Sequence, residues 1–209
     1  MATAEILVAF HSRHGATAEL ARQICRGIES VEDAMATLRS VPDVSSESER
    51  AVRAVPAEGA PFVSLDDLRR CDGLLLGSPT RFGNMAAPVK HFLDSTSALW
   101  ADGSLIGKPA GVFTGSSSLH GGQESTLLSM MVPLMHHGML IVGVPFAQQE
   151  LSTTRSGGTP YGASHFTPYG NAPALTTEEI AIARAQGARV AEIALALKGR
   201  RESRARTAR

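Results

Sequence analysis

The segment GLLLGSPTRFGN, from Gly73 to Asn84, carries the strongest indication of fold in this sequence of 209 residues. Its first five residues form an uninterrupted apolar run, which is typical of a parallel β-strand covered by helices on both faces. The residues from Ser78 onward are mostly polar, and Pro79 and Gly83 give the backbone a tight path. The segment therefore predicts a buried strand that ends in a loop with several hydrogen-bond donors.

The same order of strand, polar loop and helix recurs on both sides of this segment. Five apolar runs predict strands, and parallel neighbours need helical crossovers. We therefore predict an α/β fold with a doubly wound, five-stranded parallel sheet and helices on both faces. Ser64 and the Thr176-Thr177-Glu178-Glu179 sequence are expected to cap the helices that follow them. The expected strands are residues 6–10, 36–38, 73–77, 110–114 and 139–144, and the expected helices include 64–70, 86–94, 123–137 and one beginning near Thr176.

The length fits a single domain, since domains commonly reach about 200 residues before they split. We expect this domain to span residues 1–199, with surface insertions near 41–63, 95–108 and 145–173. The last of these has no hydrophobic periodicity, and so long a connection is usually functional or serves assembly. Residues 200–209 are expected to be a basic, frayed C-terminal tail.

Composition excludes several classes of function. Lys plus Arg and Asp plus Glu number 20 each, so no global field favours nucleic acid or an anionic membrane. Cys25 and Cys71 have neither metal-type spacing nor the density of a disulfide scaffold, which is typical of reduced thiols in the cytoplasm. No secretory leader and no apolar run of about 18 residues is present, so we expect a cytoplasmic protein without membrane insertion.

Three polar loops leave the carboxyl ends of the expected strands, where ligands of such sheets bind. The first, SRHGAT at residues 12–17, leads into a helix N-terminus, whose free N–H groups and dipole favour a phosphate. Ser12 and Thr17 add hydroxyl groups. Gly15 is its single glycine and no Gly-Lys-Ser/Thr follows, so it is neither a dinucleotide fingerprint nor a Walker loop. The alternative is an ordinary strand-to-helix turn.

The second and third loops offer hydrogen-bond donors to a planar ring. In the second, Thr80, Arg81 and Asn84 are donors and Phe82 is aromatic, which suits a flavin; alternatively, Arg81 and Phe82 simply cover the sheet edge. The third, residues 116–122, brings serine hydroxyls to another helix N-terminus, which would favour negative charge on the ring. His11 and His14, like the adjacent His136 and His137, lack the carboxylate or cysteine partners of a metal site, so no metal is expected.

Five motifs along the chain occur in one characteristic order: GSPTRFGNM (77–85), LW (99–100), GGQE (121–124), HHGM (136–139) and GGTPYGA (157–163). In these motifs the chain resembles the WrbA-type flavoproteins, the flavodoxin-like NAD(P)H:quinone oxidoreductases, from Ile6 to about Leu197. The resemblance implies a flavodoxin-like fold, FMN as cofactor and NADH or NADPH as co-substrate. It also implies a quinone as the substrate and a homotetramer whose pockets are completed by neighbouring subunits.

The resemblance also assigns roles to individual positions. The first loop would bind the FMN phosphate, the second the isoalloxazine, and the third the ring and ribityl side. His136 would border the flavin pocket, and Trp100 and His14 would contact substrate. The cofactor-binding residues expected in this way are Ser12, Arg13, His14, Gly15, Ala16, Thr17, Pro79, Thr80, Arg81, Phe82, Gly83, Asn84, Ser116, Ser117, Ser118, Leu119, Gly121 and His136.

The chain departs from the family pattern at two places. His14 stands where many relatives have a tyrosine that stacks on the dinucleotide, and the third loop is one residue longer than the common form. No side chain is expected to be catalytic, because hydride chemistry belongs to the flavin. We expect a ping-pong, two-electron reduction of quinones to hydroquinones. The alternatives are a flavodoxin-type single-electron carrier for protein partners, and an accessory protein without useful catalysis.

Overall fold

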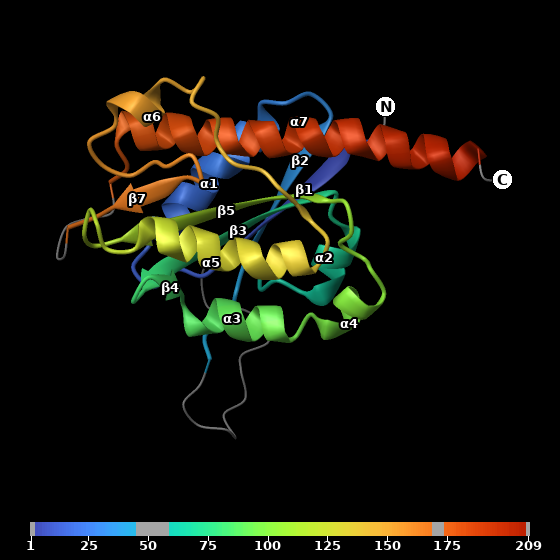
Figure 1. Ribbon diagram of the computed structural model, residues 1–209, viewed down its shortest axis with the longest axis horizontal. Helices are drawn as coiled ribbons and strands as arrows, with labels where there is room; N and C mark the ends of the chain where they lie inside the picture. The colour runs from blue at the N-terminus through green and yellow to red at the C-terminus, as the bar shows by residue number, and fades with distance from the viewer. Residues whose placement is uncertain (1–2, 45–58, 169–173, 208–209) are drawn as a thin grey trace.

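The protein, in its computed structural model, is described at residues 3–44, 59–168 and 174–207, with side chains described as far as Lys198. At its centre is a sheet of parallel strands (Figure 1). Its core consists of β1 (Ala4–Phe10), β2 (Ala34–Ser40), β3 (Gly73–Arg81) and β5 (Pro109–Ser116), in the spatial order β2-β1-β3-β5. Strand β3 extends four residues past the expected apolar run, because the backbone turns back at its end and pairs with β4 (Asn84–Met85).

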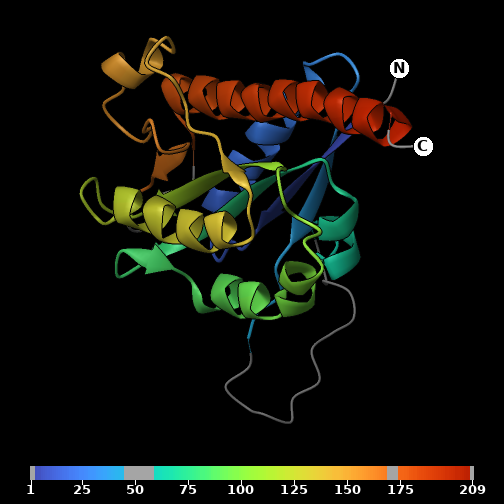
Figure 2. The same ribbon diagram turned by 45° about the vertical axis from the view of Figure 1, so that its right-hand side comes forward.

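Helices cover both faces of the sheet (Figure 2). On one face, α1 (Ala16–Glu29) and α7 (Thr177–Thr207) pack together over a core that contains Ile6 and Val8. On the other face, a second core surrounds Leu7 and Leu76. This alternation of successive β1 residues between two cores explains the continuous apolar run. The helices of the second face are α2 (Leu65–Arg70), α3 (Ala87–Asp94), α4 (Ser97–Ala101) and α5 (Gln123–His136). The prediction of a doubly wound sheet is confirmed.

The fifth strand position is built from two short pieces, which corrects the expected strand at 139–144. Strand β6 (Leu140–Ile141) pairs with the start of β5, and β7 (Ser164–Phe166) pairs with its end. Between them the chain leaves the sheet: the Val142 N–H still donates to Ala110 O of β5, but the Val144 N–H donates to Pro160 O. This loop, residues 142–163, contains the short helix α6 (Glu150–Thr153) and returns over β5, where a Cβ on Gly162 would lie 2.0 Å from Val112 O. Residues 145–168 therefore contain regular structure, namely α6 and β7.

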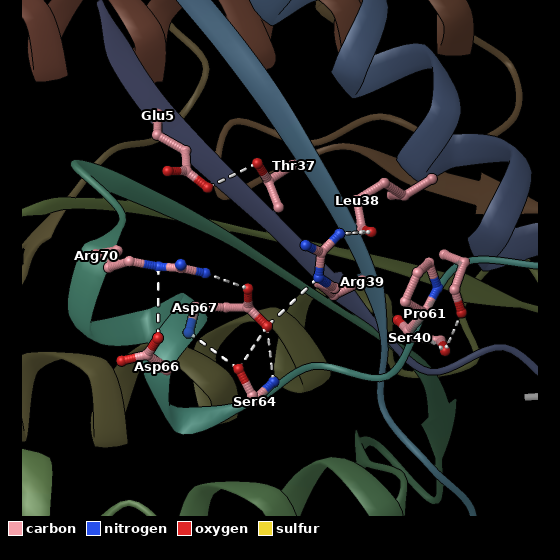
Figure 3. Close-up of polar contacts among 11 residues, drawn as sticks. Glu5, Thr37, Leu38, Arg39, Ser40, Pro61, Ser64, Asp66, Asp67 and Arg70 are labelled. Atoms are coloured by element: carbon pink, nitrogen blue, oxygen red, sulfur yellow. Dashed lines mark hydrogen bonds and ion pairs between the residues drawn. The ribbon is translucent and has the colours of Figure 1, made fainter. Parts of the chain in front are cut away.

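The start of α2 is fixed by a capping box, as expected for Ser64. The Asp67 N–H donates to Ser64 Oγ at 3.1 Å, and the Ser64 N–H donates to Asp67 Oδ2 at 2.9 Å (Figure 3). Arg39 of the edge strand β2 approaches the same carboxylate at 3.4 Å. Burial acts to raise the pKa of Asp67, but the hydrogen bonds from Ser64 and the charge of Arg39 outweigh it, and the pKa is lowered. Asp67 thus joins α2 to the sheet edge.

Helix α7 begins with the expected capping box and ends beyond the expected domain boundary. The Glu179 N–H donates to Thr176 Oγ1 at 3.2 Å, and the Thr176 N–H donates to Glu179 Oε2 at 2.9 Å. The backbone remains helical through Thr207, so most of the segment 200–209 continues the helix instead of fraying from Lys198 onward. Residues 45–58, which form most of the expected insertion at 41–63, lie outside the described residues. Within the described ranges, no helix is both long and apolar enough to cross a membrane.

Candidate functional site

A cleft of about 460 Å³ opens at the carboxyl ends of β1, β3 and β5, where the three polar loops begin. This is the edge at which ligands of doubly wound sheets bind. The expected loops therefore meet at one place, although they are far apart in sequence. The cleft is lined by Ser12, Arg13, His14, Ala16, Thr17, Pro79, Thr80, Arg81, Gly115, Ser116, Ser117, Thr167 and Pro168.

The first loop ends at Gly15, which precedes α1 in a left-handed conformation with φ of 88°. Gly15 has no side chain to cap the first turn of α1. Among the described residues, Ser12 Oγ accepts a hydrogen bond from the Ala18 N–H in that turn, at 3.3 Å. The N–H groups of the first turn thus point toward the same cleft as the Ser12 and Thr17 hydroxyls and the Arg13 cation. This combination favours an anion.

The second loop is a β-hairpin, with Thr80 paired to Met85 and Arg81 to Asn84. Its two central residues, Phe82 and Gly83, have φ of 52° and 75°, as a type I′ turn requires. A phenylalanine in this region is strained by about 1 kcal/mol or more. Its side chain is also fully exposed on the single chain. Strain and an exposed aromatic ring at the same residue are typical of a functional position.

The hairpin is locked against the start of α5. Thr80 Oγ1 lies 2.7 Å from Thr126 Oγ1, and the backbone at Gly122 approaches the hairpin so closely that a Cβ there would lie 2.6 Å from Gly83 Cα. Gly122 also has a positive φ of 94°. The third loop is ordered by internal bonds, among them Gln123 Nε2 donating to Ser118 O at 3.0 Å. The second and third loops therefore form one rigid wall of the cleft.

Trp100 and His136 lie in a separate hollow of about 750 Å³ between α3, α4 and α5. Their ring centroids are 6.3 Å apart. Asn84, from the far side of the hairpin, lines this hollow instead of the cleft, as does His137, whose pKa is lowered by burial and by His136. Within one chain, Trp100 and His136 do not line the cleft, although Asn84 of the second loop lines the same hollow as they do. The other expected residues that do not line the cleft are Gly15, Phe82, Gly83, Ser118, Leu119 and Gly121.

Three residues that line the cleft were not expected from the sequence: Gly115, Thr167 and Pro168. Gly115 directly follows the expected strand 110–114, so its place at the ligand-binding edge of the sheet could have been predicted from the end of that strand. Thr167 and Pro168 follow β7, which has three residues and no detectable periodicity. The Thr167 N–H donates to Ser116 O at 2.9 Å, which continues the pairing of β7 with β5 and places Thr167 beside the third loop.

Comparisons with known proteins agree with this geometry. Residues 6–150 match the family described as NADPH-dependent FMN reductase. The chain is 43% identical over 197 residues to an NAD(P)H dehydrogenase (quinone) of Syntrophobacter fumaroxidans, covering 91% of this chain and 97% of that protein. It is also 43% identical to an NAD(P)H dehydrogenase (quinone) of Acidithiobacillus ferrooxidans, covering 93% and 98%.

Solved structures show the same fold. The flavodoxin, WrbA-like protein of Agrobacterium tumefaciens superposes with a TM-score of 0.66 at 25% identity, over 92% of this chain and 98% of that one. A flavodoxin from the Archaea superposes with a TM-score of 0.60 at 19% identity, which supports the fold alone. With its family match, its full-length relatives and its ordered motifs, the chain belongs to the NADPH-dependent FMN reductase family and, within it, to the WrbA-type flavoproteins.

Proposed function

We propose that the protein is an FMN-dependent NAD(P)H:quinone oxidoreductase that reduces quinones by two electrons to hydroquinones. The observation that carries this proposal is the convergence of three donor-rich loops on one cleft, in a chain whose full-length relatives are named NAD(P)H dehydrogenase (quinone). FMN, when bound, would supply the hydride chemistry that links NAD(P)H to the quinone, and a proton from solvent would complete the hydroquinone. The chain itself would bind the flavin, orient both substrates and shield the flavin from water.

The donor set of the cleft fits FMN. The first turn of α1, with the hydroxyls of Ser12 and Thr17 and the charge of Arg13, would hold the phosphate. Gly115 leaves room beside it, since a Cβ there would lie 3.7 Å from Thr17 Oγ1. In the second loop Pro79, Thr80 and Arg81, which line the cleft, would hold the isoalloxazine, and in the third loop Ser116 and Ser117 would follow the ribityl chain and the ring edge. The N–H and hydroxyl donors there would face the ring where negative charge gathers on reduction.

We also propose that the active form is a homotetramer in which Trp100 and His136 complete the cleft of a neighbouring subunit. Support comes from their position in a second hollow and from the apolar side chains around it. Val132 and Trp100, which line this hollow, are each more than half exposed on the single chain, and exposed apolar groups of this kind mark interaction surfaces. The exposed Phe82 ring at the hairpin tip would be covered in the same assembly.

We also propose that the nicotinamide and the quinone use the same space in the cleft in turn. His14, which lines the cleft, would stack on the nicotinamide dinucleotide. Initial rates measured at several concentrations of both substrates should then give parallel double-reciprocal lines, as a ping-pong scheme requires. Intersecting lines would show that both substrates bind together and would contradict the shared space.

The decisive experiment is to purify the protein, record its visible spectrum, and follow NADH and NADPH oxidation with and without benzoquinone. We expect bound FMN and turnover that depends on the quinone. Bound flavin without NAD(P)H turnover would indicate a flavodoxin-type electron carrier instead. A colourless protein that does not bind added FMN in calorimetry would overturn the proposal altogether.

The reaction is proposed to take place in the cytoplasm. Cys25 and Cys71 lie in the two cores on opposite faces of the sheet, so they cannot form a disulfide with each other. Burial, and to a lesser extent the charge of nearby Glu29, raises the pKa of the Cys25 thiol to about 12, so this thiol is unreactive at neutral pH. Both properties suit a reducing compartment.

A further inference from the structure

A buried, hydrogen-bonded histidine–carboxylate pair lies directly behind the cleft. His165 of β7 and Glu179 of α7 have side chains 1% and 0% exposed, and His165 Nδ1 lies 2.7 Å from Glu179 Oε2. The same carboxylate accepts hydrogen bonds from Ser156 Oγ at 2.7 Å and from the N–H groups of Gly157 at 2.8 Å and Thr176 at 2.9 Å. So many donors to one carboxylate stabilise its ionised form.

The ionised state of Glu179 fixes the proton on one nitrogen of His165. Burial acts to raise the pKa of Glu179, but the hydrogen bonds from His165, Thr176 and Ser156 outweigh it, and the pKa is lowered. A carboxylate has only acceptor oxygens, so His165 Nδ1 must carry the proton that it donates. The open question at this site is whether the second nitrogen, Nε2, also carries one.

The second nitrogen connects the pair to the cleft. His165 Nε2 is hydrogen-bonded to Thr167 Oγ1, and Thr167 lines the cleft. Strand β7 also borders the proposed phosphate loop: a Cβ on Gly115 would lie 3.8 Å from His165 O and 3.7 Å from Thr17 Oγ1. A chain of three hydrogen-bonded side chains, Glu179, His165 and Thr167, therefore runs from the buried start of α7 to the cleft.

The proton on Nε2 decides what Thr167 can offer a ligand. When His165 is neutral, Nε2 accepts the hydroxyl proton of Thr167, and only the lone pairs of Thr167 Oγ1 remain for the cleft. When His165 is protonated, Nε2 donates to Thr167 Oγ1, and the hydroxyl proton is free to bond an acceptor. An anion in the cleft therefore favours the protonated histidine, whose charge Glu179 balances.

We propose that Thr167 is a further ligand of the FMN phosphate, and that His165 takes up one proton when the phosphate binds. One N–H bond forms as Nε2 takes a proton from a solvent or buffer acid, and the Thr167 hydroxyl keeps its own proton and turns to donate to a phosphate oxygen. His165 and Glu179 act as positioning residues, because they touch the ligand only through Thr167. This inference rests on the proposed site for FMN and adds to it a proton-linked wall from β7 and α7.

Other charged groups also lie on the elements that surround this pair. Among the described residues, Glu179 is the charged group in hydrogen-bond contact with His165. On α1, Glu19 and Arg22 pair with each other at 2.7 Å. Other charged or titratable groups on α1, α7 and the adjoining loops include Arg13, His14, Arg26, Glu29, Glu150, Arg155, Glu178, Arg184, Arg189, Glu192 and Lys198.

The direct test is the nuclear magnetic resonance spectrum of ring nitrogens in the full chain labelled with ¹⁵N-histidine. Spectra are recorded at pH 7.5 with FMN, with riboflavin and with neither flavin, and His165→Gln identifies its signals among the seven histidines. We expect a neutral ring protonated on Nδ1 without flavin and with riboflavin, and a doubly protonated ring with FMN. A ring that stays neutral with FMN would overturn the inference, and so would equal protonation by both flavins.

Affinities of two variants provide a second test that does not alter the buried pair. Thr167→Val keeps the shape of the side chain and removes the hydroxyl. It should weaken FMN about tenfold, as expected for a hydrogen bond to a charged group, and leave riboflavin affinity unchanged. Thr167→Ser should restore FMN affinity. Equal weakening of both flavins would place the hydroxyl on the ribityl chain and contradict the inference.

The two proposals fail in distinguishable ways. If the purified chain shows no flavin absorbance and takes up no FMN, the proposed function fails. If FMN binds and quinone is reduced while His165 stays neutral, only the proton-linked role of His165 is lost. Calorimetry of FMN binding in two buffers of different ionisation enthalpy gives the same distinction, because the wild type should take up more protons than Thr167→Val.

Discussion

At the scale of single residues, two glycines separate the effect of backbone strain from the effect of close packing. Gly107 and Gly122 have φ of 72° and 94°, so an alanine is strained at either position. A Cβ at Gly107 meets nothing within 4 Å, whereas one at Gly122 would lie 2.6 Å from Gly83 Cα. The first position therefore reports strain alone, and the second also reports displacement of the hairpin.

We expect Gly107→Ala to lower the free energy of unfolding by about 1 to 2 kcal/mol and to leave FMN affinity unchanged. Gly122→Ala should cost more than this, because the hairpin must move, and it should weaken FMN as well. Urea unfolding and calorimetric titration with FMN measure the two quantities. Equal FMN affinity of both variants would contradict a rigid wall formed by the second and third loops.

The positions of these residues were predictable to different degrees. Ser12 to Thr17 and Pro79 to Arg81 could be placed at one edge of the sheet, because apolar runs mark where parallel strands end. The positive φ of Phe82 could not be predicted, since a phenylalanine rarely adopts it and only pairing of β3 with β4 imposes it. Thr167 was missed because its position depends on a hydrogen-bonded ladder and not on any local pattern.

At the scale of elements, the capping box of α2 makes stability depend on the ionisation of Asp67. Its folded pKa lies below the ordinary value near 3.9, so it contributes stability above pH of about 4. This contribution is lost as the pH falls through the lower, folded pKa. The same carboxylate caps the helix and receives Arg39 from β2.

Asp67→Asn should lower the free energy of unfolding at pH 7 by about 1 kcal/mol, because the amide caps the helix without the charge that attracts Arg39. The difference from the wild type should shrink below a pH of about 4, where Asp67 becomes protonated in the unfolded chain and then in the folded one. Urea unfolding at several pH values measures it. A difference that stays constant down to pH 3 would show that the charge of Asp67 is not involved.

Elements were predicted well where they are long and poorly where they are short. Strands β1, β3 and β5 and helices α1 and α5 have apolar patterns that reach over several residues. Strands β6 and β7 have two and three residues, and each exists because β5 offers free backbone groups. Such pieces leave no periodicity in the sequence, so one continuous strand at 139–144 was the natural but wrong interpretation.

At the scale of the whole molecule, the cleft and the hollow with Trp100 and His136 are separate within one chain, and the proposed assembly brings them to one substrate. The family resemblance assigned His136 to the flavin pocket and Trp100 to the substrate, but the position of both side chains in one chain follows from how α3, α4 and α5 pack. Periodicity contains no such information. The assembly proposed above can therefore be tested by distributing the two sites between chains.

We expect a chain carrying Trp100→Ala and a chain carrying Arg81→Ala to be weakly active alone and to regain quinone reduction when refolded or expressed together. In a mixed assembly, some clefts combine intact loops from one chain with an intact tryptophan from the other. Each homogeneous variant at the same total concentration is the control. Activity of the mixture no greater than the mean of the two variants would show that each cleft is complete within its own subunit.

Because the strand at the sheet edge is divided into β6 and β7, the segment between them can change while β7 keeps its place. Because β7 is tied to α7 through Glu179 and to β5 through its own ladder, it does not depend on β6 for its position. Residues 145–150, which are exposed or half-buried between the two halves, can therefore be lengthened or replaced to meet a different neighbour or substrate. Strand β7, beside the cleft, stays attached to α7 and β5 when that segment changes. A new specificity can therefore arise in the segment without a change in the cleft.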